Sequence, residues 1–191
     1  QCPSFTDYIQ YLKANPTELT EFVNVVTTNT THFFREIEHF QFVQNVVVPE
    51  WIQNFRFKPF FAWSAASSSG EEAFSLAVVL SELGSVHGFD YRILGTDIST
   101  EVLDKAKAGI YRDEQLQAGF SEHLKQKYLQ RGVGKNAGLF RFIPELQRNI
   151  KFRHFNLIED KLPLTSGFDL ILLRNVLIYF SKETTQKVVD K

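Results

Sequence analysis

The stretch FFAWSAASSSGEEA, residues 60–73, decides the fold of this chain. An apolar run gives way to small residues, one glycine and two acids, and a helical pattern follows. This order of residue types predicts a buried strand, a tight loop and the N-terminus of a helix, which together open a nucleotide-type site in α/β sheets. We therefore expect an α/β fold with a Rossmann-like, doubly wound sheet.

The loop in this stretch favours one type of ligand. Dinucleotide-binding turns need several glycines because the backbone approaches a pyrophosphate closely, and Gly70 is the only glycine between Phe60 and Leu83. The N–H groups after the loop can receive a carboxylate, and Glu71 and Glu72 can pair with an ammonium. S-adenosylmethionine carries both groups and no phosphate, so it suits the loop better than NAD or ATP. The alternative to a ligand site is an ordinary helix, in whose first turn the two acids only interact favourably with the helix dipole.

The chain has 191 residues, enough for one ordinary domain or a compact domain with a small appendage. Its formal net charge of −1 argues against bulk electrostatic capture of nucleic acid, so we expect no nucleic-acid partner. The charge is uneven, however, because residues 105–153 hold 11 Lys and Arg against 4 Asp and Glu. This basic region favours an acidic partner.

Cysteine usage and hydropathy bear on the compartment. Cys2 is the only cysteine, so an intramolecular disulfide is impossible and a reducing compartment is the default. No signal peptide is visible, and polar residues interrupt the longest apolar stretch, residues 168–180. We therefore expect a cytoplasmic protein without direct membrane insertion. The chain starts with Gln1 and contains no methionine, from which we expect a fragment of a longer protein.

The N-terminal part predicts packing helices. Residues 4–26 read as two of them, because Ser4 resembles the start of a capping box and Asn15-Pro16 supplies an N-cap followed by a proline at the first helical position. Residues 46–57 predict a further helix that Pro49 kinks or restarts.

Between these helices lies the stretch TTNTTHFFREIEHFQF, residues 27–42. It predicts a run of cap-forming polar residues that leads into a helix, with Asn29, Thr31 and Arg35 near its start. Arg35 lies one turn beyond Thr31, so both can point at the same ligand. One cap is enough to begin a helix, and the surplus therefore indicates a functional role, although solvent exposure explains it nearly as well.

After the loop, residues 73–83 predict a helix that Gly84 ends. YRILGT at residues 91–96 predicts a second strand, which Asp97 closes. An acid at this point of a doubly wound sheet faces the ligand crevice and can accept hydrogen bonds from ribose hydroxyls. A helix cap is the alternative role for Asp97, although Ser99 already fills that place.

Residues 111–149 interrupt the alternation of strands and helices. A polar helical pattern at residues 121–131 leads into a loop with three glycines and then into the strand-like LFRF. Arginine and lysine side chains make this insert basic. An insert of this size docks a partner or substrate about as often as it is decorative.

Two more strands are expected near the end of the chain. IKFRHFN at residues 150–156 ends in Asn156, and FDLILL at residues 168–173 is followed by Arg174 and Asn175. The ends of these strands face the ligand crevice in a parallel sheet. Strong hydrogen-bonding side chains after a buried strand are costly unless they are satisfied, which favours a site role for Arg174 and Asn175.

Taken in order, TTNTTHFFRE, WSAASSSGEE, the DI after the second strand and RNVLIYF resemble the CheR family of chemotaxis-receptor glutamate methyltransferases. The similarity spans nearly the whole chain. It implies a class I S-adenosylmethionine-dependent methyltransferase sheet with a small inserted subdomain. We accordingly expect an N-terminal helical region and linker at 1–58, and a methyltransferase domain at 59–191 with the subdomain at about 111–149.

The resemblance also implies roles for the matching residues. S-adenosylmethionine is the expected cofactor, S-adenosylhomocysteine is the expected product, and no metal site is expected. Arg35 and Tyr179 are the expected catalytic residues, nearest the transferred methyl group, and Glu71 is a less certain neighbour of the cofactor. The expected cofactor-binding residues are Asn29, Thr31, Arg35, Glu72, Asp97, Asn156, Leu157, Arg174 and Asn175.

The reaction implied is methyl esterification of glutamate side chains in the cytoplasmic region of chemoreceptors, with the insert docking a receptor's C-terminal tail. A related methyltransferase acting on another protein or on a small carboxylic acid is one alternative. A non-catalytic module that binds cofactor or receptors is another. The family's sheet has further strands after RNVLIYF, whereas this sequence ends at Lys191, so we expect an incomplete domain with an exposed fourth strand.

Overall fold

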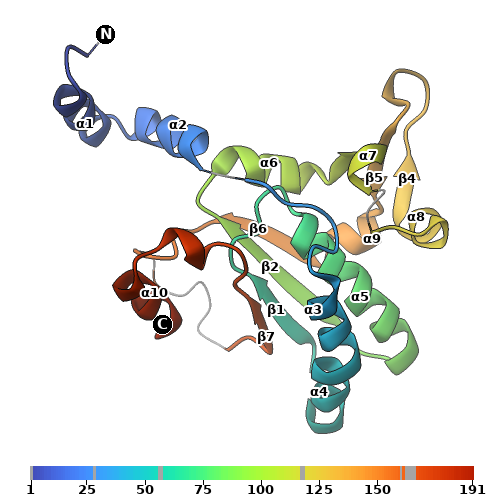
Figure 1. Cartoon of the computed structure of the whole chain (residues 1–191). Coiled ribbons are helices and arrows are strands. Elements are labelled where there is room, and N and C mark those ends of the chain that lie inside the picture. Colours follow the sequence, from blue (N-terminus) through green and yellow to red (C-terminus); the bar gives the residue numbers. More distant parts are fainter. Residues whose placement is uncertain (1, 28, 56–57, 117–118, 160, 162–166) are drawn as a thin grey trace.

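The computed structural model describes residues 2–27, 29–55, 58–116, 119–159, 161 and 167–191. Its centre is a four-stranded parallel sheet in the order β6-β2-β1-β7 (Figure 1). This order corresponds to the 3-2-1-4 portion of a doubly wound sheet. The predicted α/β class with a Rossmann-like parallel sheet is therefore confirmed. The strands are β1 (Phe60–Ser64), β2 (Tyr91–Asp97), β6 (Ile150–His154) and β7 (Leu170–Leu172).

Helix α5 (Glu71–His87) follows β1 and packs its apolar residues against the sheet. The predicted end of this helix at Gly84 is wrong. The helix continues for one more turn and stops before Gly88, whose φ of +73° gives the left-handed cap that glycine adopts most easily. Helix α6 (Thr100–Ala108) follows β2, and the side chain of Ser99 caps it as expected by accepting a hydrogen bond from the N–H of Val102.

The predicted N-terminal helices are present as α1 (Phe5–Ala14) and α2 (Pro16–Val26), which project from the sheet in Figure 1. Asn15 is the N-cap of α2 and Pro16 its first residue, as predicted, although the side chain of Asn15 donates to the carbonyl of Tyr11 over 2.8 Å and makes no cap bond. Helix α2 contacts the rest of the chain at α6. There Oδ1 of Asn24 accepts hydrogen bonds from the hydroxyl of Ser99 (2.9 Å) and the N–H of Thr100 (3.1 Å).

The segment before α3 (Ile37–Phe42) differs most from expectation. No helix begins near Thr31, and the backbone is irregular until Ile37, with positive φ at Phe34 (+53°) and Glu36 (+54°). Thr31 and Arg35 are therefore not one helical turn apart as predicted. Tertiary contacts hold the irregular path, since the N–H of Phe34 donates to Oγ of Ser75 on α5 at 2.9 Å.

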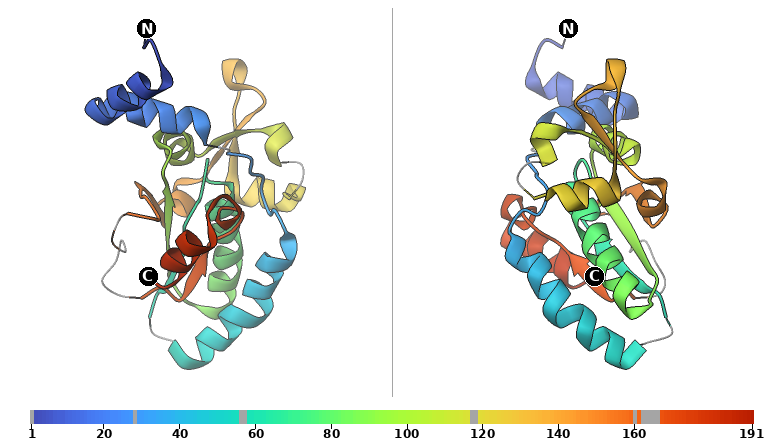
Figure 2. Two further views of the ribbon diagram at one scale, coloured as in Figure 1. Left: turned by 60° about the vertical axis from the view of Figure 1, so that its left-hand side comes forward. Right: turned by 90° about the vertical axis from the view of Figure 1, so that its right-hand side faces the viewer.

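The chain then runs alongside α5 in both views of Figure 2. A π-helical turn at Val43–Val47 leads into α4 (Val48–Phe55), with Pro49 in the first turn, so the predicted restart at this proline is confirmed. Phe40, Val43, Val48 and Trp51 face the main core. Trp51 also meets Phe60 of β1 with ring centres 5.2 Å apart, so this layer packs against the sheet as well as against α5.

The insert contains a three-stranded antiparallel sheet in the order β3-β5-β4. The helix predicted at 121–131 is shorter, because Leu129–Arg131 form β4 and pair with Phe140–Phe142. The insert is built from β3 (Ile110–Arg112), α7 (Asp113–Leu116), α8 (Glu122–Tyr128), β4, a 3-10 turn at Gly134–Asn136, β5 (Leu139–Phe142) and α9 (Pro144–Gln147).

Strand β7 lies at the outer edge of the main sheet and is shorter than the predicted 168–173. Ile171 in its middle is 51% exposed, so this strand is not the buried central one that its composition suggested. A 3-10 turn at Leu177–Tyr179 and helix α10 (Lys182–Val189) follow. None of the helices in the described ranges combines the length and apolarity that a membrane crossing requires.

Candidate cofactor site at the carboxyl edge of the sheet

A cavity of about 540 Å³ opens where the parallel strands end. Its walls come from the segment before α3, the loops after β1 and β2, and the segments after β6 and β7. The structure brings all ten predicted site residues to this one cavity, while their individual roles stay predictions. They are Asn29, Thr31, Arg35, Glu72, Asp97, Asn156, Leu157, Arg174, Asn175 and Tyr179.

Asp97 is the last residue of β2 and is 9% exposed. One carboxylate oxygen accepts the N–H of Ser68 at 2.9 Å and the other accepts the N–H of Ser99 at 3.0 Å. Burial raises the pKa of Asp97, and these backbone bonds oppose the rise. These backbone donors thus fix the orientation of the carboxylate at the cavity.

The loop between β1 and α5 needs its glycine. Gly70 has φ of +99°, and a Cβ there would lie 2.9 Å from the hydroxyl oxygen of Tyr111 and 3.0 Å from Cβ of Ala106. Tyr111 donates its hydroxyl proton to the carbonyl of Ser69 over 2.7 Å. This glycine therefore permits close packing of the loop against the protein rather than against a pyrophosphate.

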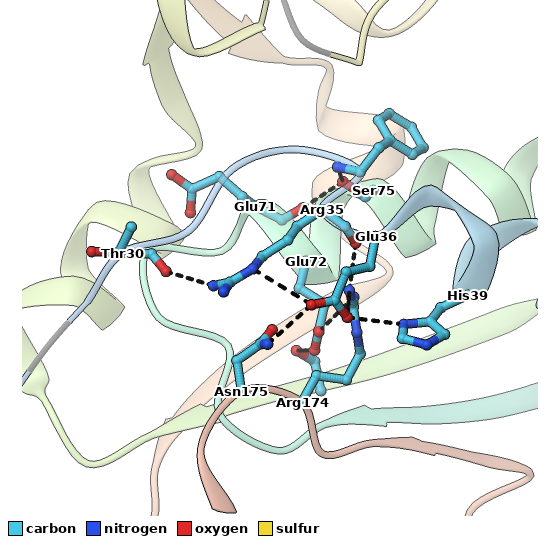
Figure 3. A network of polar contacts seen from close by, with 11 residues as sticks. Thr30, Arg35, Glu36, His39, Glu71, Glu72, Ser75, Arg174 and Asn175 are labelled. Carbon is cyan, nitrogen blue, oxygen red and sulfur yellow. Dashed lines mark hydrogen bonds and ion pairs between the residues drawn. The ribbon is translucent and has the colours of Figure 1, made fainter. Parts of the chain in front are cut away.

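The two acids after this glycine take different positions. Glu72 lines the cavity, where its carboxylate accepts the hydroxyl of Ser64 at 2.7 Å and Nη1 of Arg174 at 3.1 Å (Figure 3). Burial raises the pKa of Glu72 against these two bonds. Glu71 is 2% exposed, pairs with the hydroxyl of Ser69 at 2.7 Å and is not among the residues that line the cavity. The expectation that both acids face an ammonium is therefore wrong for Glu71.

Glu36, which no sequence pattern singled out, joins the two sides of the site (Figure 3). Its carboxylate accepts Nη2 of Arg174 and Nδ2 of Asn175, each at 3.1 Å, and lies 3.3 Å from Nδ1 of His39. Arg174 also donates to the carbonyl of Arg35. The only signal in the sequence was the position of this acid directly after Arg35, within the motif TTNTTHFFRE.

The two predicted catalytic residues are partly accessible to solvent. Arg35 donates from Nη1 to the carbonyl of Thr30 at 3.0 Å, its Nε lies 3.9 Å from Oε1 of Glu36, and its side chain is 34% exposed. Tyr179 is 61% exposed. Both line the cavity and have surface open to a second reactant.

Backbone strain gathers around the cavity. In the described part of the chain, positive φ at residues other than glycine occurs at Phe34, Glu36, Ser68 and Asn175. Ser68 and Asn175 line the cavity, and the other two flank Arg35. Such conformations cost about 1–3 kcal/mol each and concentrate at ligand sites, where the surrounding structure enforces them. This observation supports a binding site independently of the motifs.

The remaining lining residues are mostly apolar and were missed. Phe40, Phe155, Ile98 and Ile158 contribute to the walls together with Val26 and Ile178. No periodicity distinguishes them from core positions, because they come from separate loops and helices that only the fold brings together.

The fold and the cavity define a class of protein: an α/β domain that holds a nucleoside-containing ligand at the carboxyl edge of a doubly wound sheet. The family model described as CheR methyltransferase, SAM binding domain, matches residues 29–191. The chain therefore belongs to the CheR methyltransferase family, as its motifs predicted. The expected cofactor, S-adenosylmethionine, is confirmed for this family.

Curated relatives agree with this assignment. Chemotaxis protein methyltransferase 2 of Pseudomonas aeruginosa is 40% identical over 191 residues, which is 98% of this chain and 66% of the relative. A chemotaxis protein methyltransferase of Salmonella typhimurium is 39% identical over 98% of this chain and 63% of its own length. The chain thus spans slightly less than two thirds of the length of these two relatives.

One solved structure, a putative S-adenosyl-L-methionine-dependent methyltransferase from Methanococcus maripaludis, aligns with 85% of this chain and with 61% of its own chain. The sequence identity is 12% and the TM-score is 0.37, which is too low to bear on function.

Proposed function

We propose that this chain transfers a methyl group from S-adenosylmethionine to glutamate side chains in the cytoplasmic region of chemoreceptors, which produces glutamate methyl esters. The observation that carries the proposal is the convergence of all ten predicted site residues on one cavity at the carboxyl edge of the sheet. Membership of the CheR methyltransferase family and the names of the relatives support it. The cytoplasm is the compartment that this role requires.

The cavity is suited to the cofactor in size and in chemistry. Its volume of about 540 Å³ lies within the usual range for small-molecule sites, roughly 300–1,000 Å³. Asp97 offers two oriented acceptors for ribose hydroxyls or the adenine end. Arg174 lines the cavity, and its Nε is buried without a hydrogen-bond partner in the described residues, so it can donate to a carboxylate.

The proposed reaction needs little from the protein beyond orientation. When bound, S-adenosylmethionine supplies a methyl group on a positively charged sulfur, which leaves as a neutral thioether. An acceptor glutamate has a reference pKa of about 4.3 and is already a carboxylate at neutral pH, so no general base is needed. One carboxylate oxygen forms the new bond to the methyl carbon as the carbon–sulfur bond breaks. Arg35 orients this carboxylate, and Tyr179 positions it by a hydrogen bond.

The substitution Arg35→Ala tests this assignment in the full-length natural protein. We expect turnover of a chemoreceptor cytoplasmic fragment to fall at least about 100-fold, while the affinity for S-adenosylhomocysteine changes severalfold at most. Radiolabelled methyl transfer and calorimetry measure the two quantities. Lys187→Ala is the control, because this exposed cation of α10 pairs only with Glu183 among the described residues. Unchanged turnover would remove Arg35 from the mechanism, and methyl groups that resist mild alkali would exclude an ester product.

The insert is proposed to dock the receptor's C-terminal tail. Arg131, Lys135 and Arg141 are exposed on it and make no ion pair within the described ranges, so an acidic tail can pair with them. Reversing the charge of Arg131 and Arg141 should weaken binding of a labelled tail peptide in anisotropy titrations and reduce its salt dependence. Equal affinities for the wild-type and charge-reversed proteins would exclude this docking surface.

A further inference from the structure

The carboxylate of Glu36 connects two walls of the cavity that are distant in sequence. Glu36 lies in the segment before α3, whereas its partners Arg174 and Asn175 follow β7. Its side chain is 42% exposed, while that of Arg174 is only 10% exposed. Both terminal oxygens of Glu36 are used, one by each partner, so this single side chain fixes the orientation of two predicted cofactor ligands.

The same carboxylate also balances charge. Two cations, Arg35 and Arg174, lie on this side of the cavity, and two acids, Glu36 and Glu72, pair with them. The hydrogen bond from Asn175, and to a smaller extent that from Arg174, lowers the pKa of Glu36, so its carboxyl group is ionised at neutral pH. Glu72 accepts hydrogen bonds at both oxygens, as a carboxylate does. Without Glu36, the wall would carry two cations against one acid.

We propose that Glu36 is a positioning residue that holds Arg174 and Asn175 in place and keeps the cavity wall electrically neutral toward a cationic cofactor. This inference rests on the cofactor of the proposed function. S-adenosylmethionine carries a sulfonium and an ammonium against one carboxylate, a net charge of +1. S-adenosylhomocysteine lacks the sulfonium and is neutral overall. A wall with one extra positive charge therefore disfavours the substrate form relative to the product form.

The test uses calorimetric titration with both compounds at pH 7.5. Glu36→Gln keeps the shape and one acceptor but removes the charge, whereas Glu36→Asp keeps the charge on a shorter side chain. Glu38→Gln is the matched control, an exposed acid in the first turn of α3 that has no polar contact in the described part of the chain. Thermal unfolding of each variant verifies that it is folded.

For Glu36→Gln we expect the dissociation constant of S-adenosylmethionine to rise about tenfold, and to rise at least about threefold more than that of S-adenosylhomocysteine. Glu36→Asp should leave the ratio of the two constants near the wild-type value, and Glu38→Gln should change neither constant. Dissociation constants within twofold of wild type for Glu36→Gln, or equal weakening of both compounds, would overturn the proposal.

These outcomes are separable from the proposed function. A wild-type protein that binds both compounds without methylating receptors would contradict the proposed reaction while the ratio still tests Glu36. If the protein methylates receptors and Glu36→Gln leaves both dissociation constants unchanged, only the inference about Glu36 is contradicted.

Discussion

The cavity wall and the contact between the insert and α5 are built on opposite principles. The wall consists of buried or half-buried ions, irregular backbone and positive φ at Phe34, Glu36, Ser68 and Asn175. The buried centre of the insert contact is apolar and aromatic. Phe142 of β5 is fully buried and stacks on Phe74 of α5 with ring centres 4.1 Å apart.

The aromatic contact continues around Phe142. Phe33 meets Tyr111 and Phe120 edge to face, with ring centres 4.8 Å and 5.2 Å apart. These residues belong to the same core cluster as the strands of the main sheet. The chain thus obtains rigidity from the aromatic cluster and carries local backbone strain at the cavity. Substitutions in the two regions should therefore affect different quantities.

The largest effect is expected from Phe142→Ala. Removing this stacked ring leaves a cavity in the aromatic cluster, and we expect the free energy of unfolding to fall by about 3–5 kcal/mol. Urea denaturation measures the loss, and Val133→Ala is the control, since Val133 is 81% exposed in the insert. A loss below about 1 kcal/mol would mean that the insert does not share the core with the main sheet.

The substitution Asp97→Ala tests ligand binding at the cavity. We expect the affinity for S-adenosylhomocysteine to fall about 100-fold, equivalent to about 2.7 kcal/mol, because the oriented acceptors disappear. Calorimetry measures the affinity. Asp104→Ala is the matched control on α6, where Asp104 is an exposed acid that pairs with Lys107. Undiminished binding by the Asp97 variant would show that this acid serves only the backbone N–H groups of Ser68 and Ser99.

Gly70→Ala tests the point where the two regions meet. The added Cβ would lie 2.9 Å from the hydroxyl of Tyr111 at a φ of +99°, so we expect a loss of about 1–3 kcal/mol in the free energy of unfolding. Gly88→Ala separates the two causes. It has a φ of +73° with nothing within 4 Å of the new Cβ, and should lose only about 1 kcal/mol, from backbone strain alone. Equal losses would mean that the contact with Tyr111 is unimportant.

The smallest effect concerns pH. Glu82 of α5 accepts Nζ of Lys127 at 2.7 Å and the hydroxyl of Tyr128 in the insert. Burial alone would raise the pKa of Glu82, but these two partners outweigh it and the pKa lies below 4.5. Glu82→Gln should therefore cost less than about 1 kcal/mol at pH 7, and this difference should vanish as the pH falls below about 4.5.

The contribution of Glu72 to stability should depend on pH in the opposite direction. Its pKa is raised above 4.5 by burial, so its contribution to the free energy of unfolding declines as the pH rises from about 4.5 through the higher folded pKa. Stability curves of Glu72→Gln and Glu82→Gln, measured against wild type between pH 3.5 and 7, should therefore slope in opposite directions. Parallel slopes would contradict the contrast between the two regions.

Much of the fold could be predicted because the sequence carries local signals for it. The run from Phe60 to the glycine at position 70 gave the first strand and its loop, and Ser99 fixed the start of α6. The position of Asp97 followed from the doubly wound sheet alone. In each case a residue type is nearly obligatory at one backbone position, so the pattern has few alternative interpretations.

The failures have an equally physical cause. The helical pattern near Arg35 was overridden by tertiary contacts, such as the bond from the N–H of Phe34 to Ser75, which hold an irregular path. Glu36 could not be recognised because its partners, Arg174 and Asn175, lie far along the chain. The strand at Leu129–Arg131 depends likewise on pairing with Phe140–Phe142. Long-range partners, which local patterns do not encode, decide these positions.

The distance in sequence between the two walls has a further consequence. Asn29 and Asn175 line the same cavity although they lie far apart in the sequence, and closing so long a loop carries an entropic cost that grows with its length. A cofactor that contacts both walls binds the folded chain and not the unfolded one. At 100 times its dissociation constant it adds about 2.7 kcal/mol to the free energy of unfolding. Resistance of the protein to proteolysis should accordingly rise with the concentration of S-adenosylmethionine.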